Sequence, residues 1–276
     1  MKIAAPMKIA ARPPIAILTD FGYRDHYVGA MKAVIASIAP AATVIDITHG
    51  VPPQAVTAGA LALRESWRFF PKGTVFLAVV DPGVGTARLP IAIETRAGAR
   101  FVAPDNGLAW PATEQAGFRR AVELRSARYR MARVSATFHG RDIFAPAAAW
   151  LWRGARITGF GPNVKQITPL EITGATRQGP KLGGAVIYID HYGNLVTNIG
   201  RESLERFASS FLAGELSVRI DSSPPIRIVK AYGEARKGAP LAAFGSFELL
   251  EIAVRDGSAA EKFGARQGAR VWVTKG

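Results

Sequence analysis

The chain of 276 residues contains no cysteine. This absence excludes disulfide bonds, zinc sites built on thiolates and a cysteine nucleophile. It also permits a reducing compartment, and we expect a cytoplasmic location. Histidine is scarce too: the four histidines, His26, His49, His139 and His191, lack the spacing of metal ligands, and no HExxH motif occurs. We therefore expect no bound metal.

Several nucleotide-binding and catalytic motifs are also missing. The sequence has no GxGxxG and no Walker GxxxxGK[ST], and its "DPGVG" lacks the lysine of a phosphate loop. A GxSxG nucleophile elbow is absent as well. These absences argue against a dinucleotide, a P-loop and an α/β-hydrolase serine, and we expect no cofactor.

Long apolar runs are lacking, since none reaches the roughly 18 residues of a membrane-spanning helix. The first residues, "MKIAAPMKIAARPP", contain only short apolar pieces and make a poor signal peptide. We expect residues 1–14 to be a disordered leader, with Met7 as a second candidate start. A membrane partner is not expected.

The net charge of +14 raises the alternative of a nucleic-acid-binding protein. The basic residues, however, are spread along the chain, as in "RRAVELRSARYRMAR" and "RIVKAYGEARKG", without interleaved stacking aromatics. Basic residues distributed in this way are typical of solvated faces, so a nucleic-acid partner is not expected.

The apolar pattern predicts two domains. Residues 15–174 alternate strands (14–20, 42–48, 73–81, 89–95 and 99–105) with helices (25–40, 52–71 and 142–154). This order predicts an α/β domain with a mostly parallel sheet flanked by helices. The Gly-rich stretch 174–184 is a linker candidate, and strand-rich segments follow it. Residues 175–276 are thus predicted to form a smaller, antiparallel, barrel-like β domain.

Polar residues collect where the predicted parallel strands end. They are Asp20 after the first strand, Asp46, Thr48 and His49 at the second, Asp81 at the third, and Asp105 and Asn106 at the fifth. Each alone is explained by a turn or a helix cap. Together they predict a ligand site, because open α/β sheets bind ligands outside the carboxyl ends of their strands.

The stretch "VFLAVVDPGVGTAR" is unusual because an apolar strand ends on a carboxylate, Asp81, and a turn through Gly83 and Gly85 leads to Arg88. The glycines allow the backbone to approach a ligand closely. A structural ion pair between Asp81 and Arg88 is the alternative interpretation.

Six segments together resemble one family. They are "ILTDFGYRDHYVGAMK", "VVDPGVGTAR", "VAPDNGL", "TFHGRDIFAPAAA", "IDHYGNLVTNI" and "FELLEIAV", in the family's order. The family is the S-adenosyl-L-methionine (SAM) hydroxide adenosyltransferases, or SAM hydrolases, which are relatives of the SAM-dependent fluorinase and chlorinase. The resemblance implies homotrimers whose sites lie between the N-terminal domain of one subunit and the C-terminal domain of the next.

The resemblance also implies roles for individual residues. Asp81, Arg88 and His139 match the triad that holds the attacking water, and Asp20 matches the carboxylate that grips both ribose hydroxyls. The other implied substrate-binding residues are Asn106, Asp190, Tyr192, Asn194 and Ser246.

The implied reaction is hydrolysis of SAM to adenosine and methionine by attack of water on the ribose C5′. One alternative is a SAM or adenosine sensor with negligible turnover. A SAM-dependent halogenase is another, although that branch carries other residues in place of Asp81 and His139. Gly245 and Glu248 depart from the family pattern, which leaves the adenine-edge contacts of their loop in question.

Overall fold

The computed structural model describes residues 12–209 and 216–275. The chain divides into two compact units, Met1–Leu170 and Glu171–Gly276. Most of the expected leader, residues 1–14, lies outside the described residues. Its described end is packed: the carbonyl oxygen of Pro13 accepts a hydrogen bond from Trp152 Nε1 at 2.6 Å. No helix among the described residues combines the length and the apolar character needed to span a membrane.

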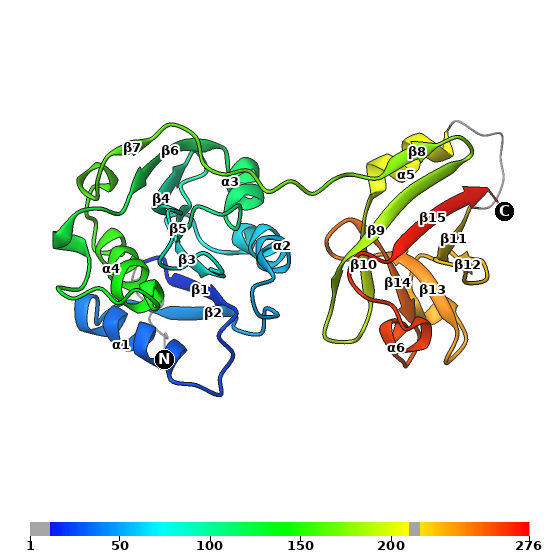
Figure 1. Ribbon diagram of the computed structural model, residues 1–276, viewed down its shortest axis with the longest axis horizontal. Helices are drawn as coiled ribbons and strands as arrows, with labels where there is room; N and C mark the ends of the chain where they lie inside the picture. The colour runs from blue at the N-terminus through cyan, green and yellow to red at the C-terminus, as the bar shows by residue number, and fades with distance from the viewer. Residues whose placement is uncertain (1–11, 210–215, 276) are drawn as a thin grey trace, which may run out of the picture. The chain divides into compact units, whose positions relative to one another are not determined.

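A seven-stranded sheet in the order β2-β1-β3-β5-β4-β6-β7 forms the centre of the N-terminal unit (Figure 1). The parallel strands are β2 (Val44–Thr48), β1 (Ile15–Thr19), β3 (Val75–Val79) and β5 (Arg100–Pro104). The strands β4 (Pro90–Thr95), β6 (Phe118–Glu123) and β7 (Asn163–Val164) continue the sheet antiparallel. Every residue of β1 and β3 is buried, as expected for central strands covered on both faces.

Helices cover both faces of this sheet (Figure 1). On one face α1 (Tyr27–Ile38) packs against α4 (Ala145–Trp152), and the buried Met31 of α1 shares a core cluster with Ile17 and Leu77. The opposite face carries α2 (Val56–Ser66) and α3 (Trp110–Ala116). A Cβ at Gly59 of α2 would lie 2.9 Å from the side chain of Leu108 and 3.0 Å from that of Val80.

The helix boundaries differ in detail from those predicted. Asp25 is not the N-cap of α1, since that position is His26 and no side chain caps the helix. The helix α2 begins at Val56 rather than near residue 52, because Gln54 adopts φ +66° in a turn before it. The segment predicted as one helix at 142–154 begins instead as a π-helix, η3 (Gly140–Phe144), and continues as α4. Pro146 lies in the first turn of α4, directly after η3, and as a proline it donates no backbone hydrogen bond there.

The C-terminal unit is an antiparallel sheet in the order β12-β11-β15-β9-β10-β14-β13. Its strands are β9 (Lys181–Ile189), β10 (Leu195–Gly200), β11 (Leu216–Ile220), β12 (Ile226–Arg227), β13 (Pro240–Phe244), β14 (Leu249–Val254) and β15 (Arg270–Lys275). A bridge between Ile228 and Ala242 connects the two ends of this order, so the sheet nearly closes on itself. The predicted fold class is therefore confirmed: an α/β unit followed by a smaller barrel-like β unit.

The prediction that residues 174–184 form a linker is wrong. Residues 176–178 form β8 (Thr176–Gln178), which pairs with β9 across a turn at Gly179, where φ is +58°. The glycines of this stretch therefore build a hairpin, and the division between the units falls four residues before the predicted 174/175 boundary.

Candidate functional site

The polar residues predicted at the carboxyl edge of the sheet do follow strands that end at the same level. Leu18 is paired with Thr48 on one side and with Ala78 on the other. Burial, the larger cause, and the charge of Asp81 raise the pKa of Asp20. The parallel part of the sheet thus brings two carboxylates to one edge.

Arg88 joins Asp81 and His139 into one cluster. Its Nε donates to Asp81 Oδ1 at 2.8 Å, and its Nη2 donates both to Asp81 Oδ2 and to His139 Nδ1, the latter at 2.9 Å. The side chains of Asp81 and Arg88 are 6% and 9% exposed. A cluster at the sheet edge therefore unites three residues that are up to 58 positions apart in the sequence, 81 to 139.

The bond from Arg88 defines the state of His139. A guanidinium has only donors, so Nδ1 must accept, and the proton of the neutral ring is assigned to Nε2. Burial, and next the charge of Arg88, lower the pKa of His139 below its usual value. Geometry and electrostatics thus both favour a neutral imidazole.

The turn "DPGVG" brings the two halves of this cluster together. Gly85 has φ +77°, and a Cβ placed there would lie 2.6 Å from the carbonyl oxygen of Ala136. The close approach predicted from the glycines is therefore made to the protein's own backbone, three residues before His139. The turn that leads to Arg88 therefore contacts the segment that leads to His139.

Replacing Gly85 by alanine is expected to destabilise the protein by about 2 kcal/mol. A left-handed conformation costs alanine about 1 kcal/mol, and the rest comes from the clash with a backbone oxygen that has little room to move. Urea unfolding of the full chain measures the difference. Gly154→Ala is the matched control, since Gly154 has φ +98° with no atom within 4 Å of its Cβ position. Equal losses in the two variants would contradict the role of the Ala136 contact.

Packing and hydrogen bonds hold the segment around His139. The π-helix η3 starts directly after this residue, and such one-turn irregularities are frequent at functional sites. The guanidinium of Arg88 lies over the ring of Phe144 at 5.2 Å. Asp142 is 1% exposed and accepts a hydrogen bond from the backbone N–H of Ser135 at 2.8 Å.

Two further residues predicted at this edge make backbone contacts. Asn106 donates from Nδ2 to the carbonyl oxygen of Val80 at 2.9 Å and accepts at Oδ1 from the N–H of Leu108. It therefore holds the backbone immediately before Asp81. Asp20 accepts at Oδ2 from the N–H of Gln54 at 2.8 Å, which occupies only one of its carboxylate oxygens.

The remaining predicted binding residues lie in the C-terminal unit, around a cavity of about 1070 Å³. The predicted residues that line it are Asp190, Tyr192, Asn194 and Ser246. The carboxylate of Asp190 accepts hydrogen bonds from the N–H groups of Tyr192 and Asn194 and from Asn194 Nδ2, each at 2.9 Å. The ring of Tyr192 is 74% exposed and is open to contact with a ligand.

Sequence reasoning missed two residues of this cavity, Glu251 and Tyr232. Glu251 is 6% exposed on β14 and accepts a hydrogen bond from the hydroxyl of Tyr232. Burial, the larger cause, and the charge of Asp190 raise the pKa of Glu251. A Cβ at Gly245 would lie 2.2 Å from Glu251 Oε2, so the glycine that departs from the family pattern makes room for this carboxylate. A single charge inside the apolar run "LLEIAV" was the available signal.

No group of three or more histidine, cysteine, aspartate or glutamate side chains in the described part of the chain is arranged to hold a metal ion.

The fold and the site define a class: two-domain α/β proteins with a polar cluster at the carboxyl edge of a parallel sheet and a second pocket in a β domain. The chain belongs to the SAM hydroxide adenosyltransferase family. The model of that family's N-terminal domain matches residues 15–161, and the model of its C-terminal domain matches residues 184–272.

Characterised relatives and solved structures agree with this membership. The chain is 42% identical to the (R)-S-adenosyl-L-methionine hydrolase of Thermus thermophilus over 94% of this chain and 98% of the relative. It is 39% identical to the enzyme of the same name from Salinispora tropica, over 97% and 100%. The fluorinase of an Actinoplanes species is more distant, at 28% identity over 98% and 100%. A crystal structure of an uncharacterised conserved protein from Thermotoga maritima superposes with a TM-score of 0.85 at 36% identity, covering 95% of this chain and all of that one.

Proposed function

We propose that this protein is a SAM hydrolase that converts SAM and water to adenosine and methionine. The observation that carries the proposal is the buried Asp81–Arg88–His139 cluster in a chain whose relatives at up to 42% identity are named for this reaction. Asp81 and His139 are the two positions at which the resemblance distinguishes hydrolases from halogenases. Both side chains are hydrogen-bonded to Arg88. This arrangement favours water as the nucleophile.

The proposed step is an in-line displacement at the ribose C5′. A bond forms from the water oxygen to C5′ as the C5′–S bond breaks, and methionine leaves as a neutral thioether that needs no acid. The chemical difficulty is therefore the weak nucleophile, which must be oriented and must lose a proton. Neutral His139 donates from Nε2–H to the water oxygen and is not a base at that atom. Asp81 takes the proton, and Arg88 holds both partners in place.

The two binding regions divide the substrate between them. Asp20, whose Oδ2 accepts from the Gln54 N–H, uses the remaining acceptor positions of its carboxylate for the ribose hydroxyls, because a carboxylate suits a diol as a double acceptor. Tyr192 flanks the adenine, Asp190 faces the methionine ammonium, and Asn194 and Ser246 are further ligand contacts. Asn106 acts through the backbone of Val80 and so positions Asp81.

A homotrimer in which the C-terminal domain of a neighbouring subunit completes each site is part of the proposal. Its support is the family membership and the location of Asp81 and Asp190 in different units. Mixing inactive Asp81→Asn chains with inactive Asp190→Asn chains, after dissociation and reassembly, should then restore activity. Continued inactivity of the reassembled mixture, with reassembly verified by light scattering, would argue against shared sites. A cytoplasmic location remains a prediction.

Incubation with SAM in oxygen-18-labelled water, with and without chloride, tests the function. The two sulfonium epimers are assayed separately, because the names of the relatives carry the descriptor (R). Labelled adenosine together with methionine is the expected result. Formation of 5′-chloro-5′-deoxyadenosine would identify a halogenase instead. Bound SAM without any product would identify a sensor.

The pH dependence of this reaction follows from His139. Its pKa is lowered by burial and by Arg88, so activity should fall on the acid side as the ring protonates, with a midpoint below pH 6.5, the ordinary histidine value. Protonated Nδ1 cannot accept from Arg88. Measurement of kcat/KM from about pH 5 to about pH 8 checks this expectation. His139→Gln is the control, and its pH profile should lack the fall in activity at acid pH that is attributed to the histidine. If activity of the wild type fell with a midpoint above pH 6.5, the expected role of His139 would be contradicted.

A further inference from the structure

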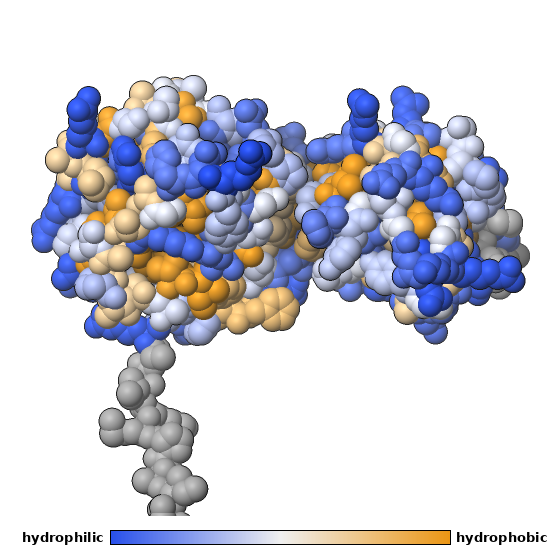
Figure 2. All heavy atoms as spheres, turned by 90° about the horizontal axis from the view of Figure 1, so that it is seen from below, coloured by the Kyte–Doolittle hydropathy of each residue, from blue (hydrophilic) through white to orange (hydrophobic). Residues whose placement is uncertain are grey.

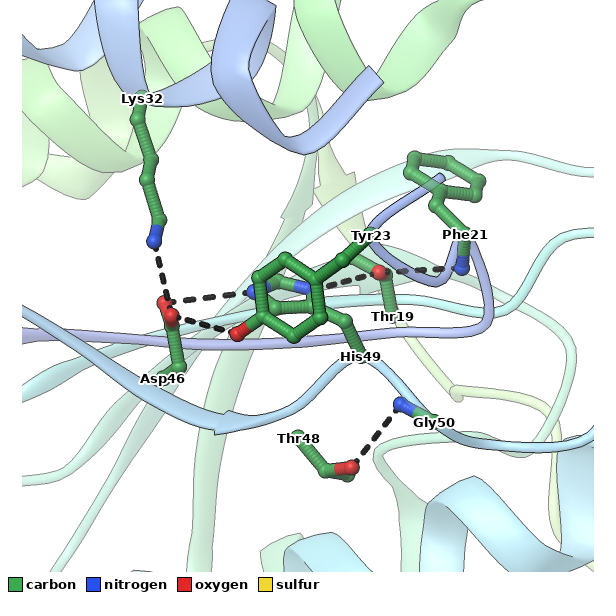
Figure 3. A network of polar contacts seen from close by, with 8 residues as sticks. All are labelled: Thr19, Phe21, Tyr23, Lys32, Asp46, Thr48, His49 and Gly50. Carbon is green, nitrogen blue, oxygen red and sulfur yellow. Dashed lines mark hydrogen bonds and ion pairs between the residues drawn. The ribbon is translucent and has the colours of Figure 1, made fainter. Parts of the chain in front are cut away.

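A polar network at the ends of β1 and β2 contains no residue of the triad (Figure 3). At its centre is His49, which is 1% exposed. Its Nδ1 lies 2.7 Å from the hydroxyl oxygen of Thr19, and its Nε2 lies 3.3 Å from Asp46 Oδ1. Asp46 Oδ2 in turn accepts from the Tyr23 hydroxyl and from Lys32 Nζ, each at 2.8 Å.

The direction of these bonds follows from Asp46, because a carboxylate only accepts. Neutral His49 is therefore assigned its N–H on the side of Asp46 and accepts at Nδ1 from the Thr19 hydroxyl, whose oxygen accepts from the N–H of Phe21 at 3.2 Å. The ring proton then lies on Nε2, facing Asp46. Burial lowers the pKa of His49 and keeps the ring neutral, as this chain of donors and acceptors requires.

The network clamps the residues on either side of Asp20. The Thr19 hydroxyl binds both His49 and the Phe21 backbone, and the N–H of Gly22 donates to the carbonyl oxygen of His49 at 2.8 Å. The loop after β1 is thereby fastened to the loop after β2, which also supplies the Gln54 N–H to the Asp20 carboxylate. Asp20 itself makes no contact with His49.

We propose that Thr19 and His49 are positioning residues that aim the Asp20 carboxylate at the ribose diol of the ligand. This role depends on the proposed function in one respect only, namely that the ligand contains an adenosine moiety. The Asp20 side chain is only partly buried, so its orientation depends on neighbouring residues. In a different orientation the carboxylate would lose one of its two hydrogen bonds to the diol. The buried hydroxyl of Thr19 supplies that support through two bonds that a methyl group cannot replace.

Binding of adenosine and of 2′-deoxyadenosine, measured by calorimetry on the full-length protein, tests this role without using turnover. Hydrogen bonds to a charged group make the wild type prefer adenosine by roughly 10- to 100-fold. Thr19→Val, which keeps the shape and removes the hydroxyl, should reduce that preference to about threefold or less, as should Asp20→Asn. Thr19→Ser should retain it. The matched control Thr113→Val should also retain it, because Thr113 is equally buried and its Oγ1 has no hydrogen-bond partner in the described structure.

The results distinguish the positioning role of Thr19 from the contact between Asp20 and the ribose. A Thr19→Val protein that keeps the full preference while Asp20→Asn loses it overturns the positioning role, even if its melting temperature falls. If Asp20→Asn keeps the preference, the ribose contact and the positioning role built on it are both wrong. Hydrolysis itself is decided independently by the labelled-water experiment.

Discussion

Replacing Asp81 by asparagine is expected to lower kcat by roughly 10²- to 10⁴-fold, the range typical of a lost general base. Asparagine keeps the size of the side chain and still accepts from Arg88, but it cannot take a proton from water. Binding of SAM should change by no more than about threefold, because Asp81 acts on the nucleophile and not on the substrate. Single-turnover kinetics and calorimetry measure the two quantities.

Glu123→Gln is a suitable control, because that carboxylate of the same domain pairs with Arg125 and not with Arg88. Its kcat should equal that of the wild type. If Asp81→Asn released adenosine at the wild-type rate, the interpretation of Asp81–Arg88 as a purely structural ion pair would be correct.

Replacing Arg88 by methionine should have the largest effect on stability. The variant leaves Asp81, 6% exposed, as an uncompensated buried charge, and breaking a buried ion pair in this way costs about 3–5 kcal/mol. It also removes the donor to His139 Nδ1, so activity should be lost together with stability. Urea unfolding and the adenosine-release assay follow the two effects.

The double variant Asp81→Asn, Arg88→Met separates those effects. Removing both charges should recover most of the lost stability, since the pair is then replaced by uncharged groups. Activity should stay at the level of Asp81→Asn. A double variant as unstable as Arg88→Met alone would mean that packing of the guanidinium against Phe144, and not the ion pair, stabilises this site.

The positions of the central strands and of the carboxyl-edge residues were predictable because parallel, fully buried strands have a strong sequence signature. The apolar runs of β1 and β3 and the polar residues directly after them lie where the pattern placed them. Asp81 and Arg88 are seven positions apart across a glycine turn, so their contact was also open to local reasoning.

The rest depended on tertiary packing. No local pattern reveals that Gly85 contacts the Ala136 backbone or that Thr19 bonds to His49, 30 positions away. The Gly-rich stretch around Gly179 resembles a linker in composition, because composition does not distinguish a flexible glycine from one that makes a hairpin turn. Glu251 was missed because strand periodicity does not show which face opens onto a cavity.

The surface shows how the hydrophilic side chains of the protein are distributed. On the face shown in Figure 2, hydrophilic side chains are distributed over both units and are not gathered into one stripe. The cavity of the C-terminal unit differs from the chain as a whole: three carboxylate residues, Asp190, Glu251 and Asp256, line it together with one arginine, Arg255.

Under the proposed function, this local inversion of sign, in a chain of net charge +14, would act as an electrostatic selector for SAM. SAM carries a net positive charge, whereas adenosine is neutral and methionine is a zwitterion. The carboxylates therefore attract the substrate by its charge and lose that hold once the sulfonium has become a thioether. In the proposed reaction the chemical step itself weakens retention of the products.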